Sequence, residues 1–221
     1  MPAQQPEGFL DSPAAGEGPG VVVLHAWWGL NDTMRTVCTR LAEEGFTAFA
    51  PDLFHGRIAT TIREAEVLSS ELEQLGSTQI KREVAQAIAF MVKRTGAERG
   101  LAVVGFSFGA YYAVDASIHS TDHVRRVVLF YGTGEGDFTR SRSAYLGHFA
   151  EKDDYESEEY IQAMEQALRA AGRPVEFYRY PGTGHWFFEQ DVKQSFNAEA
   201  AALAWERTLA FLRRPLENSP G

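Results

Sequence analysis

The sequence alternates apolar, strand-like runs with amphipathic windows of helical spacing, and this alternation limits the fold more than any other feature. The strand-like runs cover residues 20–26, 47–50, 101–106, 126–131, 144–149 and 175–180. The helical windows cover residues 31–44, 62–94, 108–120, 158–171 and 197–213, and the second window is interrupted near Gly76. Strands that alternate with helices predict an α/β fold, a mainly parallel sheet with crossover helices on both faces. A weaker run around Phe9 and Leu10 would add an edge strand and bring the sheet to about seven strands.

The length of the chain supports one domain. With 221 residues and 44% hydrophobic content, the chain can bury a full sheet, and no repeat, linker or low-complexity tract divides it. We expect an N-terminal segment over residues 1–19 that forms an edge strand or is flexible. The α/β domain is then expected over 20–214, with a C-terminal tail over 215–221.

Charge and cysteine content exclude several classes of function. The net charge is −9 and the basic residues are not clustered, which argues against nucleic acid or an anionic membrane surface as a partner. The single cysteine, Cys38, is expected to pack in the core, and it excludes a disulfide framework or a cysteine-based metal site within one chain. No apolar run has membrane-spanning length, and the first twenty residues have neither a basic start nor a hydrophobic stretch. These features predict a cytoplasmic protein.

A serine stands where the most apolar predicted strand turns into a helix. Ser107 follows the run 101–106, with Gly105 and Gly109 two residues to either side. The Gly-x-Ser-x-Gly spacing is typical of a nucleophile elbow, a strained turn that lifts the serine hydroxyl above the sheet edge. Glycine at those positions keeps side chains from colliding where the strand and the helix pass closely. The segment suggests acyl transfer through a serine ester, and the alternative is a tight strand-to-helix turn with an inert serine.

An acid and a histidine follow the last two predicted strands. Asp153 and Asp154 come after the fifth strand-like run, and His185 comes after the sixth. The C-terminal ends of parallel strands meet at one edge of a sheet, so we expect these side chains to gather with Ser107. The chain order serine, aspartate, histidine is the order expected of this fold class.

Each of these residue types has a chemical role in acyl transfer. A serine hydroxyl is a poor nucleophile at neutral pH, so His185 would accept its proton and later return it to the leaving group. An aspartate would fix the imidazole tautomer and stabilise the imidazolium. We prefer Asp153 to Asp154 because it comes first after the strand, whereas Asp154 could be solvated or help to begin the next helix. A surface-loop histidine is the alternative for His185, and Glu151 and Glu156 are expected to be solvated charges.

Two backbone amides are expected to form the oxyanion hole. One is the N–H of Phe108, the residue after the nucleophile, and the other is the N–H of Trp27 in the loop after the first long strand. The adjacent Trp27 and Trp28 either wall the pocket or pack against the next helix. His25 is expected to be a structural histidine with satisfied hydrogen bonds, and Asn31 or Asp32 is expected to cap the following helix.

Longer strings of residues surround these candidates. They are His25-Ala26-Trp27-Trp28-Gly29-Leu30-Asn31, Ala50-Pro51-Asp52-Leu53-Phe54-His55-Gly56, Tyr131-Gly132, the Asp153 turn and Tyr180-Pro181-Gly182-Thr183-Gly184-His185-Trp186-Phe187. Together with the elbow, they resemble the dienelactone hydrolase family of α/β-hydrolases over nearly all of residues 20–213. The resemblance implies a compact α/β-hydrolase core without a lid domain. It also implies hydrolysis of small esters or lactones with no metal or organic cofactor.

Three positions depart from the enzyme that names the family. That enzyme has a cysteine where this chain has Ser107 and a glutamate where it has Ala26, and the glutamate serves the resting thiol, so a serine enzyme does not need it. It also binds a substrate carboxylate with arginines, one of them four residues after the catalytic histidine, where this chain has Glu189. A glutamate there is expected to repel an anionic substrate. Arg57 and Arg63 could supply a cation, although solvated arginines are the simpler expectation.

The sequence therefore predicts a serine carboxylesterase or lactonase for a small, uncharged ester. A short apolar or aromatic substrate would suit the candidate pocket wall, which is formed by Trp28, Phe106, Tyr131, Trp186 and Phe187. A thioesterase or small peptidase could use the same triad, and a non-catalytic binding protein could keep the same fold. All three catalytic residue types occur in order, which favours an enzyme. We expect a monomer or homodimer with a small-molecule substrate and no nucleic-acid or membrane partner.

Overall fold

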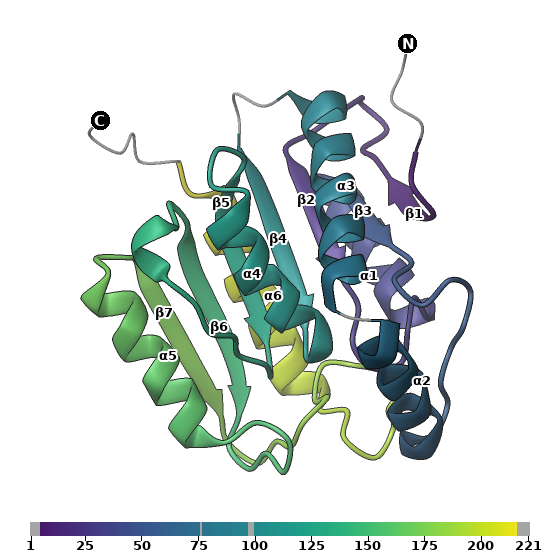
Figure 1. Ribbon diagram of the computed structural model, residues 1–221, viewed down its shortest axis with the longest axis vertical. Helices are drawn as coiled ribbons and strands as arrows, with labels where there is room; N and C mark the ends of the chain where they lie inside the picture. The colour runs from purple at the N-terminus through teal and green to yellow at the C-terminus, as the bar shows by residue number, and fades with distance from the viewer. Residues whose placement is uncertain (1–4, 76, 97–99, 216–221) are drawn as a thin grey trace.

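The computed structural model describes residues 5–75, 77–96 and 100–215. Within these residues the strands form one seven-stranded sheet in the order β1-β3-β2-β4-β5-β6-β7 (Figure 1). Neighbouring strands are parallel except β1 and β3, which are antiparallel. The strands are β1 (Gly8–Asp11), β2 (Gly20–Leu24), β3 (Thr47–Pro51), β4 (Leu101–Phe106), β5 (Val124–Phe130), β6 (Ala144–Ala150) and β7 (Val175–Tyr180).

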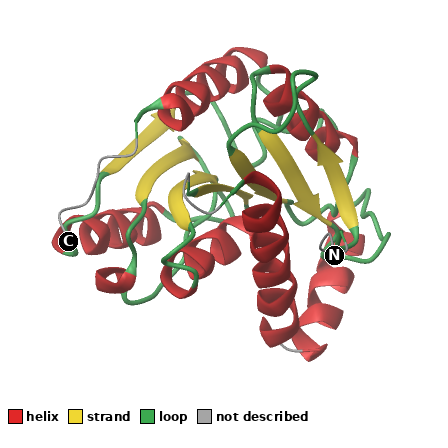
Figure 2. Cartoon of the chain, turned by 90° about the horizontal axis from the view of Figure 1, so that it is seen from above, coloured by secondary structure: helices red, strands yellow, loops and turns green. Residues whose placement is uncertain are grey.

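Helices cover both faces of the sheet (Figures 1 and 2). Side chains of α1 and α6 are buried with Val21 and Val23 on one face, whereas those of α3, α4 and α5 are buried with Val22 and Leu24 on the other. Successive β2 residues therefore point to opposite faces, as a strand requires. None of the helices in the described ranges is long and apolar enough to cross a membrane. The helices are α1 (Asp32–Glu43), α2 (Ile62–Leu75), α3 (Ser77–Thr95), α4 (Phe108–His119), α5 (Glu158–Ala170) and α6 (Ala198–Arg213), with a 3-10 turn η2 (Phe138–Arg140).

The central strands β2, β3 and β4 are buried along their whole length. A parallel strand covered on both faces is expected to be apolar throughout, and the β-branched and aromatic residues of these strands meet that requirement. In α1 the apolar side chains Met34, Val37, Cys38 and Leu41 form one buried stripe, which presses the helix onto the sheet. Cys38 therefore packs in the core, as the sequence predicts.

The predicted α/β architecture is confirmed, and the differences lie at the ends of elements. The run around Phe9 is the edge strand β1, which pairs with β3. Strand β5 begins earlier than predicted because Val124 pairs with Leu101 across a register shift in β4. The predicted break separates α2 from α3, although Gly76 itself lies outside the described residues. Residues 1–4 of the predicted N-terminal segment and 216–221 of the predicted tail lie outside them as well.

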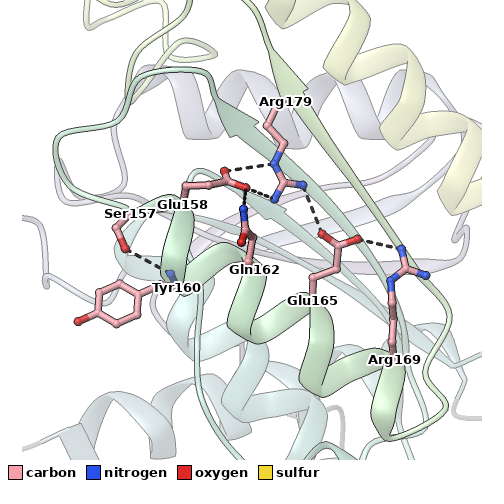
Figure 3. A network of polar contacts seen from close by, with 7 residues as sticks. All are labelled: Ser157, Glu158, Tyr160, Gln162, Glu165, Arg169 and Arg179. Atoms are coloured by element: carbon pink, nitrogen blue, oxygen red, sulfur yellow. Dashed lines mark hydrogen bonds and ion pairs between the residues drawn. The ribbon is translucent and has the colours of Figure 1, made fainter.

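Ion pairs connect α5 to the edge strand β7 (Figure 3). Arg179 of β7 donates from Nη2 to Glu158 at 2.8 Å and from Nη1 to Glu165 at 3.4 Å. Glu165 also accepts a hydrogen bond from Arg169 at 2.8 Å, and Ser157 caps the first turn of the helix. A single exposed ion pair contributes little to stability. The ion pairs thus hold α5 against β7, and the Ser157 cap begins the helix shortly after the loop that carries Asp153.

Candidate active site

The turn between β4 and α4 holds Ser107 in a strained backbone conformation, with φ at 48° and ψ at −112°. The N–H of Ser107 donates to the carbonyl oxygen of Phe130 at 2.9 Å, which ties the turn to the end of β5. A Cβ on Gly105 would lie 2.5 Å from the carbonyl oxygen of Gly109. A Cβ on Gly109 would lie 2.3 Å from the carbonyl oxygen of Leu24. Both glycines are therefore required by the close passage of strand and helix, as the nucleophile-elbow pattern predicts.

Three side chains form a continuous series of hydrogen bonds above this turn. The hydroxyl oxygen of Ser107 lies 2.8 Å from Nε2 of His185. Nδ1 of His185 lies 2.8 Å from both carboxylate oxygens of Asp153. The side chains of His185 and Asp153 are 5% and 4% exposed, so their interaction is shielded from water. Of the two aspartates considered from the sequence, Asp153 rather than Asp154 is the one bonded to the histidine.

The loop after β6 orients the carboxylate through backbone donors. Oδ1 of Asp153 accepts the N–H groups of Tyr155 and Glu156, both at 2.9 Å. The N–H of Lys152 donates to the carbonyl oxygen of Thr183 at 3.2 Å, so the loop is also tied to the segment that leads to the histidine. Strands β6 and β7 are neighbours in the sheet, so the loops that follow them lie side by side. These hydrogen bonds hold Asp153 and His185 next to each other.

The two predicted oxyanion donors have free N–H groups. The backbone amides of Trp27 and Phe108 form no hydrogen bond to another described residue. Phe108 is the first residue of α4, where the helix dipole adds a partial positive charge. The contact of Gly109 with the end of β2 brings the start of α4 beside the loop that carries Trp27. Both amides thus lie at the same end of the sheet as Ser107.

His25 holds the loop that carries Trp27. Its Nδ1 lies 2.8 Å from the carbonyl oxygen of Ala26, and its Nε2 accepts the N–H of Leu53 at 3.2 Å. Burial lowers the pKa of His25, which keeps the ring neutral, with the proton on Nδ1. His25 is thus a structural histidine, as expected, and it joins the loops after β2 and β3. Asn31 caps α1 by accepting the N–H of Met34 at 3.1 Å.

The five predicted wall residues lie deeper than a pocket surface. Phe106, Tyr131 and Phe187 are each 0% exposed and pack in the core on the α1 and α6 side of the sheet. Trp28 and Trp186 are 5% and 4% exposed, and their ring centroids lie 5.0 Å apart. These five side chains therefore belong to the core beneath the site, where other apolar side chains cover them.

The exposed aromatic surface beside the histidine comes from Tyr155, which the sequence analysis did not identify. Tyr155 is 48% exposed, and its ring centroid lies 5.1 Å from that of His185. The rings of Trp186 and Trp27 lie 4.7 Å and 6.0 Å from it. Its position two residues after Asp153 could have identified it from the sequence, because the turn that directs the Asp153 side chain toward His185 also places the residues next to it. Tyr155 and Trp27 form the aromatic rim of the site.

Glu156 is not the solvated charge that the sequence suggested. Its carboxylate accepts the N–H of Thr133 at 2.8 Å and the hydroxyl of Thr133 at 3.0 Å. Burial raises the pKa of Glu156, and the nearby charge of Asp153 raises it further. Glu156 therefore connects the acid loop to the loop after β5.

A hollow of about 540 Å³ lies between the loop after β3 and α2. This loop is bound to the loop that carries Trp27, because the N–H of Ala59 donates to the carbonyl oxygen of Trp28 at 3.0 Å. Arg57 is partly exposed and paired with Glu71 on α2, as expected of a solvated arginine, whereas Arg63 lines the hollow. The full lining consists of Arg57, Ile58, Thr61, Arg63, Glu64, Val67 and Leu68.

Glu189 does not face the substrate side of the site. The residue is 0% exposed, and burial raises its pKa to about 8. The carboxyl group is therefore uncharged at neutral pH and directed into the core, where it accepts a hydrogen bond from the hydroxyl of Tyr131. The expected repulsion of an anionic substrate by Glu189 is wrong, because that expectation assumed an exposed carboxylate.

The sheet order, the elbow and the arrangement of side chains at its C-terminal edge define an α/β-hydrolase. Residues 7–216 match the model of the dienelactone hydrolase family. The chain therefore belongs to the dienelactone hydrolase family, and the predicted class, a hydrolase acting on ester or lactone bonds, is confirmed.

Known proteins similar to this chain carry names that agree with the family. A Yersinia pestis protein named "Putative carboxymethylenebutenolidase" is 28% identical over 208 residues, which cover 88% of this chain and 77% of that protein. A crystal structure from Klebsiella pneumoniae, described as a "Putative Dienelactone Hydrolase", has a TM-score of 0.79 at 25% identity, over 97% of this chain and 96% of the other. A dienelactone hydrolase-like promiscuous phosphotriesterase from metagenomic libraries shares the fold, with a TM-score of 0.81 at 20% identity over 92% of this chain and 90% of that chain.

Proposed function

We propose that this chain is a serine hydrolase that cleaves a small, uncharged carboxylic ester or lactone through an acyl-enzyme on Ser107. The observation that supports this most directly is the unbroken series of hydrogen bonds from Asp153 through His185 to Ser107, at the apex of a strained elbow. Serine hydroxyls need an adjacent base to become nucleophiles at neutral pH, and this geometry provides one.

In the first half of the reaction, the hydroxyl oxygen of Ser107 attacks the carbonyl carbon while Nε2 of His185 takes the hydroxyl proton. The carbonyl oxygen becomes an oxyanion that accepts hydrogen bonds from the amides of Trp27 and Phe108. The tetrahedral intermediate then collapses to the acyl-enzyme. The leaving alkoxide takes the proton from His185 and departs as an alcohol, or stays attached to the acyl group if the substrate is a lactone.

In the second half, a water molecule replaces the alcohol. His185 takes a proton from the water, whose oxygen attacks the acyl carbon, and the resulting intermediate expels Ser107. Ser107 recovers its proton from His185, and the carboxylic acid is released. Asp153 holds the proton on Nδ1 of the imidazole throughout and stabilises the imidazolium in both halves.

The surroundings of the triad favour a small substrate with a flat or apolar group. The aromatic rim formed by Tyr155 and Trp27 offers ring faces beside His185. The name of the Yersinia pestis relative denotes lactone hydrolysis, which supports a lactone as well as an open-chain ester as the substrate. The residue four positions after His185 is the uncharged, buried Glu189, so the site has no arginine there to bind a carboxylate. The cytoplasmic location stays a prediction.

The decisive experiment compares the hydrolysis of p-nitrophenyl esters, from acetate to octanoate, by the wild-type chain and by Ser107→Ala. We expect the highest kcat/KM for the short esters and a loss of at least about a thousandfold in the variant, because the nucleophile is gone. Equal rates for the two proteins would refute the acyl-enzyme. A serine-directed phosphonate separates the enzyme from a binding protein of the same fold, since an activated Ser107 is labelled and an inert serine is not.

A further inference from the structure

Tyr131 and Glu189 form a hydrogen-bonded pair that is completely buried. The hydroxyl of Tyr131 donates to Oε1 of Glu189 at 2.7 Å, and both residues are 0% exposed. The second carboxyl oxygen, Oε2, is buried without a hydrogen-bond partner among the described residues. A carboxyl group held by one neutral hydroxyl is a costly element in a core and is seldom kept for stability alone.

The pair is built around the catalytic imidazole. Tyr131 follows the last residue of β5 with φ at 37°, and its N–H donates to the carbonyl oxygen of His148 at 2.8 Å. From this anchored position its ring lies 4.9 Å from the ring of His185 and 5.6 Å from the ring of Phe187. A non-glycine residue with positive φ is strained, and such strain is found where a side chain must be aimed.

Glu189 belongs to the turn that follows His185 directly. Its N–H donates to the carbonyl oxygen of Trp186 at 2.9 Å, and Trp186 itself has φ at 63°. The carbonyl oxygen of Glu189 accepts the N–H of Val192 at 3.0 Å, which closes the next turn. The bond to Tyr131 therefore fastens the histidine turn to the end of β5, at a point where the tyrosine ring also contacts the imidazole.

We infer that Glu189 is a positioning residue, which holds His185 in its catalytic orientation through the hydroxyl and ring of Tyr131. This inference rests on the proposed function, since it concerns the base of that reaction. Asp153 fixes the imidazole through Nδ1, and the Tyr131–Glu189 pair fixes the turn on which the imidazole is carried.

The burial of the pair depends on the protonation of Glu189. The hydrogen bond from Tyr131 favours the ionised carboxylate, but the loss of water around the buried group opposes ionisation more strongly. The groups that face it are Tyr131 from the end of β5, Asp191 from its own segment and, beyond Tyr131, the pair of His185 and Asp153. Burial raises the pKa of Glu189 to about 8, and the carboxylate of Asp191 raises it as well. Ionisation would leave a buried carboxylate with one donor and no cation, so the turn is expected to open and to release the histidine.

The test measures kcat/KM for p-nitrophenyl acetate from about pH 6 to about pH 10 on the full chain. We expect wild type to lose activity with a midpoint at about pH 8. Glu189→Gln, which keeps an oxygen acceptor but cannot ionise, should lack this loss. The matched control is Glu206→Gln, an exposed glutamate on α6, which should keep the wild-type profile. An alkaline loss in Glu189→Gln identical to that of wild type would overturn the inference.

Tyr131→Phe tests the other end of the bond. We expect kcat to fall about tenfold at neutral pH with KM within about twofold, because the ring remains but the anchor of the histidine turn is lost. An unchanged kcat in the folded variant would contradict the inference. If this variant does not fold, the comparison of Glu189→Gln with Glu206→Gln still decides.

The NMR signals of the His185 ring, followed against pH in histidine-labelled protein, give a readout that needs no turnover. In wild type these signals should report the ionisation of Glu189 through a change centred at about pH 8, and this change should be absent in Glu189→Gln. If Ser107→Ala proves as active as wild type, the proposed function fails, and this pH series still tests the positioning pair by itself. Ring signals with the same pH dependence in wild type and Glu189→Gln would overturn the inference even if the esterase assignment stands.

Discussion

At the scale of single residues, two buried carboxyl groups near His185, those of Asp153 and Glu189, have different surroundings. Asp153 accepts two backbone N–H groups and the imidazole of His185, so its oxygens are occupied by donors. Glu189 has one donor, the hydroxyl of Tyr131, which does not offset the burial that raises its pKa. A buried carboxyl group stays charged only where donors replace the lost water. The two carboxyl groups thus differ in the number of donors that hold them. Asp153, with three, is suited to orient His185, whereas Glu189, with one, is suited to be a neutral anchor.

The role of Asp153 is tested by replacing each of the two neighbouring aspartates. Asp153→Asn should lower kcat by about a thousandfold or more, because an amide facing Nδ1 favours the wrong imidazole tautomer. Asp154→Asn is the matched control and should stay within about twofold of wild type, since its carboxylate is not bonded to His185. Ester hydrolysis by the two purified variants checks this, and the reverse ranking would move the acid to Asp154.

Sequence reasoning at this scale succeeds for residues whose place follows from strand ends and fails for residues whose partners lie far along the chain. Ser107 and His185 meet because parallel strands place their C-terminal ends together. Glu156 and Glu189 were misjudged because their burial depends on Thr133 and Tyr131, which belong to a different loop. Charged residues are expected on the surface unless a partner is known, and the sequence does not reveal that partner.

At the scale of elements, the close packing of α4 on the sheet positions the candidate active site. The start of the helix lies against the backbone end of β2, which places the free amide of Phe108 beside the loop that carries Trp27. The N-terminus of α1 is fastened as well, because Asp191 accepts the N–H and hydroxyl of Thr33 at 3.1 Å and 2.7 Å. The loops of the site are thus held by the ends of helices.

This packing makes Gly109→Ala strongly destabilising. The added methyl would meet the carbonyl oxygen of Leu24 at 2.3 Å, so the helix must shift away from β2 and disturb the core on that face. We expect a loss of about 2 kcal/mol or more in the free energy of unfolding, measured by urea denaturation. Gly184→Ala is the control, because its methyl would find Lys152 at 3.6 Å, an ordinary contact. Equal stability of the two variants would contradict this account.

The elements themselves were predictable, and their ends were less so. Central strands that are apolar throughout and helices with one apolar stripe leave clear periodic patterns, as β4 and α1 show. The start of β5 was missed because pairing across a register shift extends that strand to Val124. Pairing with a neighbour, rather than local composition, decides where a strand begins.

At the scale of the whole molecule, the buried Glu189 links stability to pH. Its pKa in the folded chain is about 8, above the ordinary value of 4.5, so the unfolded chain releases this proton at lower pH than the folded chain. The contribution of Glu189 to the free energy of unfolding should therefore be greatest below about 4.5 and decline as pH rises to about 8. Thermal or urea unfolding at several pH values should show a smaller decline for Glu189→Gln than for wild type. A parallel decline in both would show that Glu189 is not the group responsible.

The crowding of aromatic rings around His185 has an optical consequence. Three of the four tryptophans of the chain, Trp27, Trp28 and Trp186, lie in the two loops that frame the triad, and Tyr155 contacts two of them. Their ultraviolet emission therefore arises mainly from the place where a substrate would dock. The protein therefore carries fluorophores around the proposed triad, so formation of the proposed acyl-enzyme on Ser107 should change the intrinsic fluorescence without any added label.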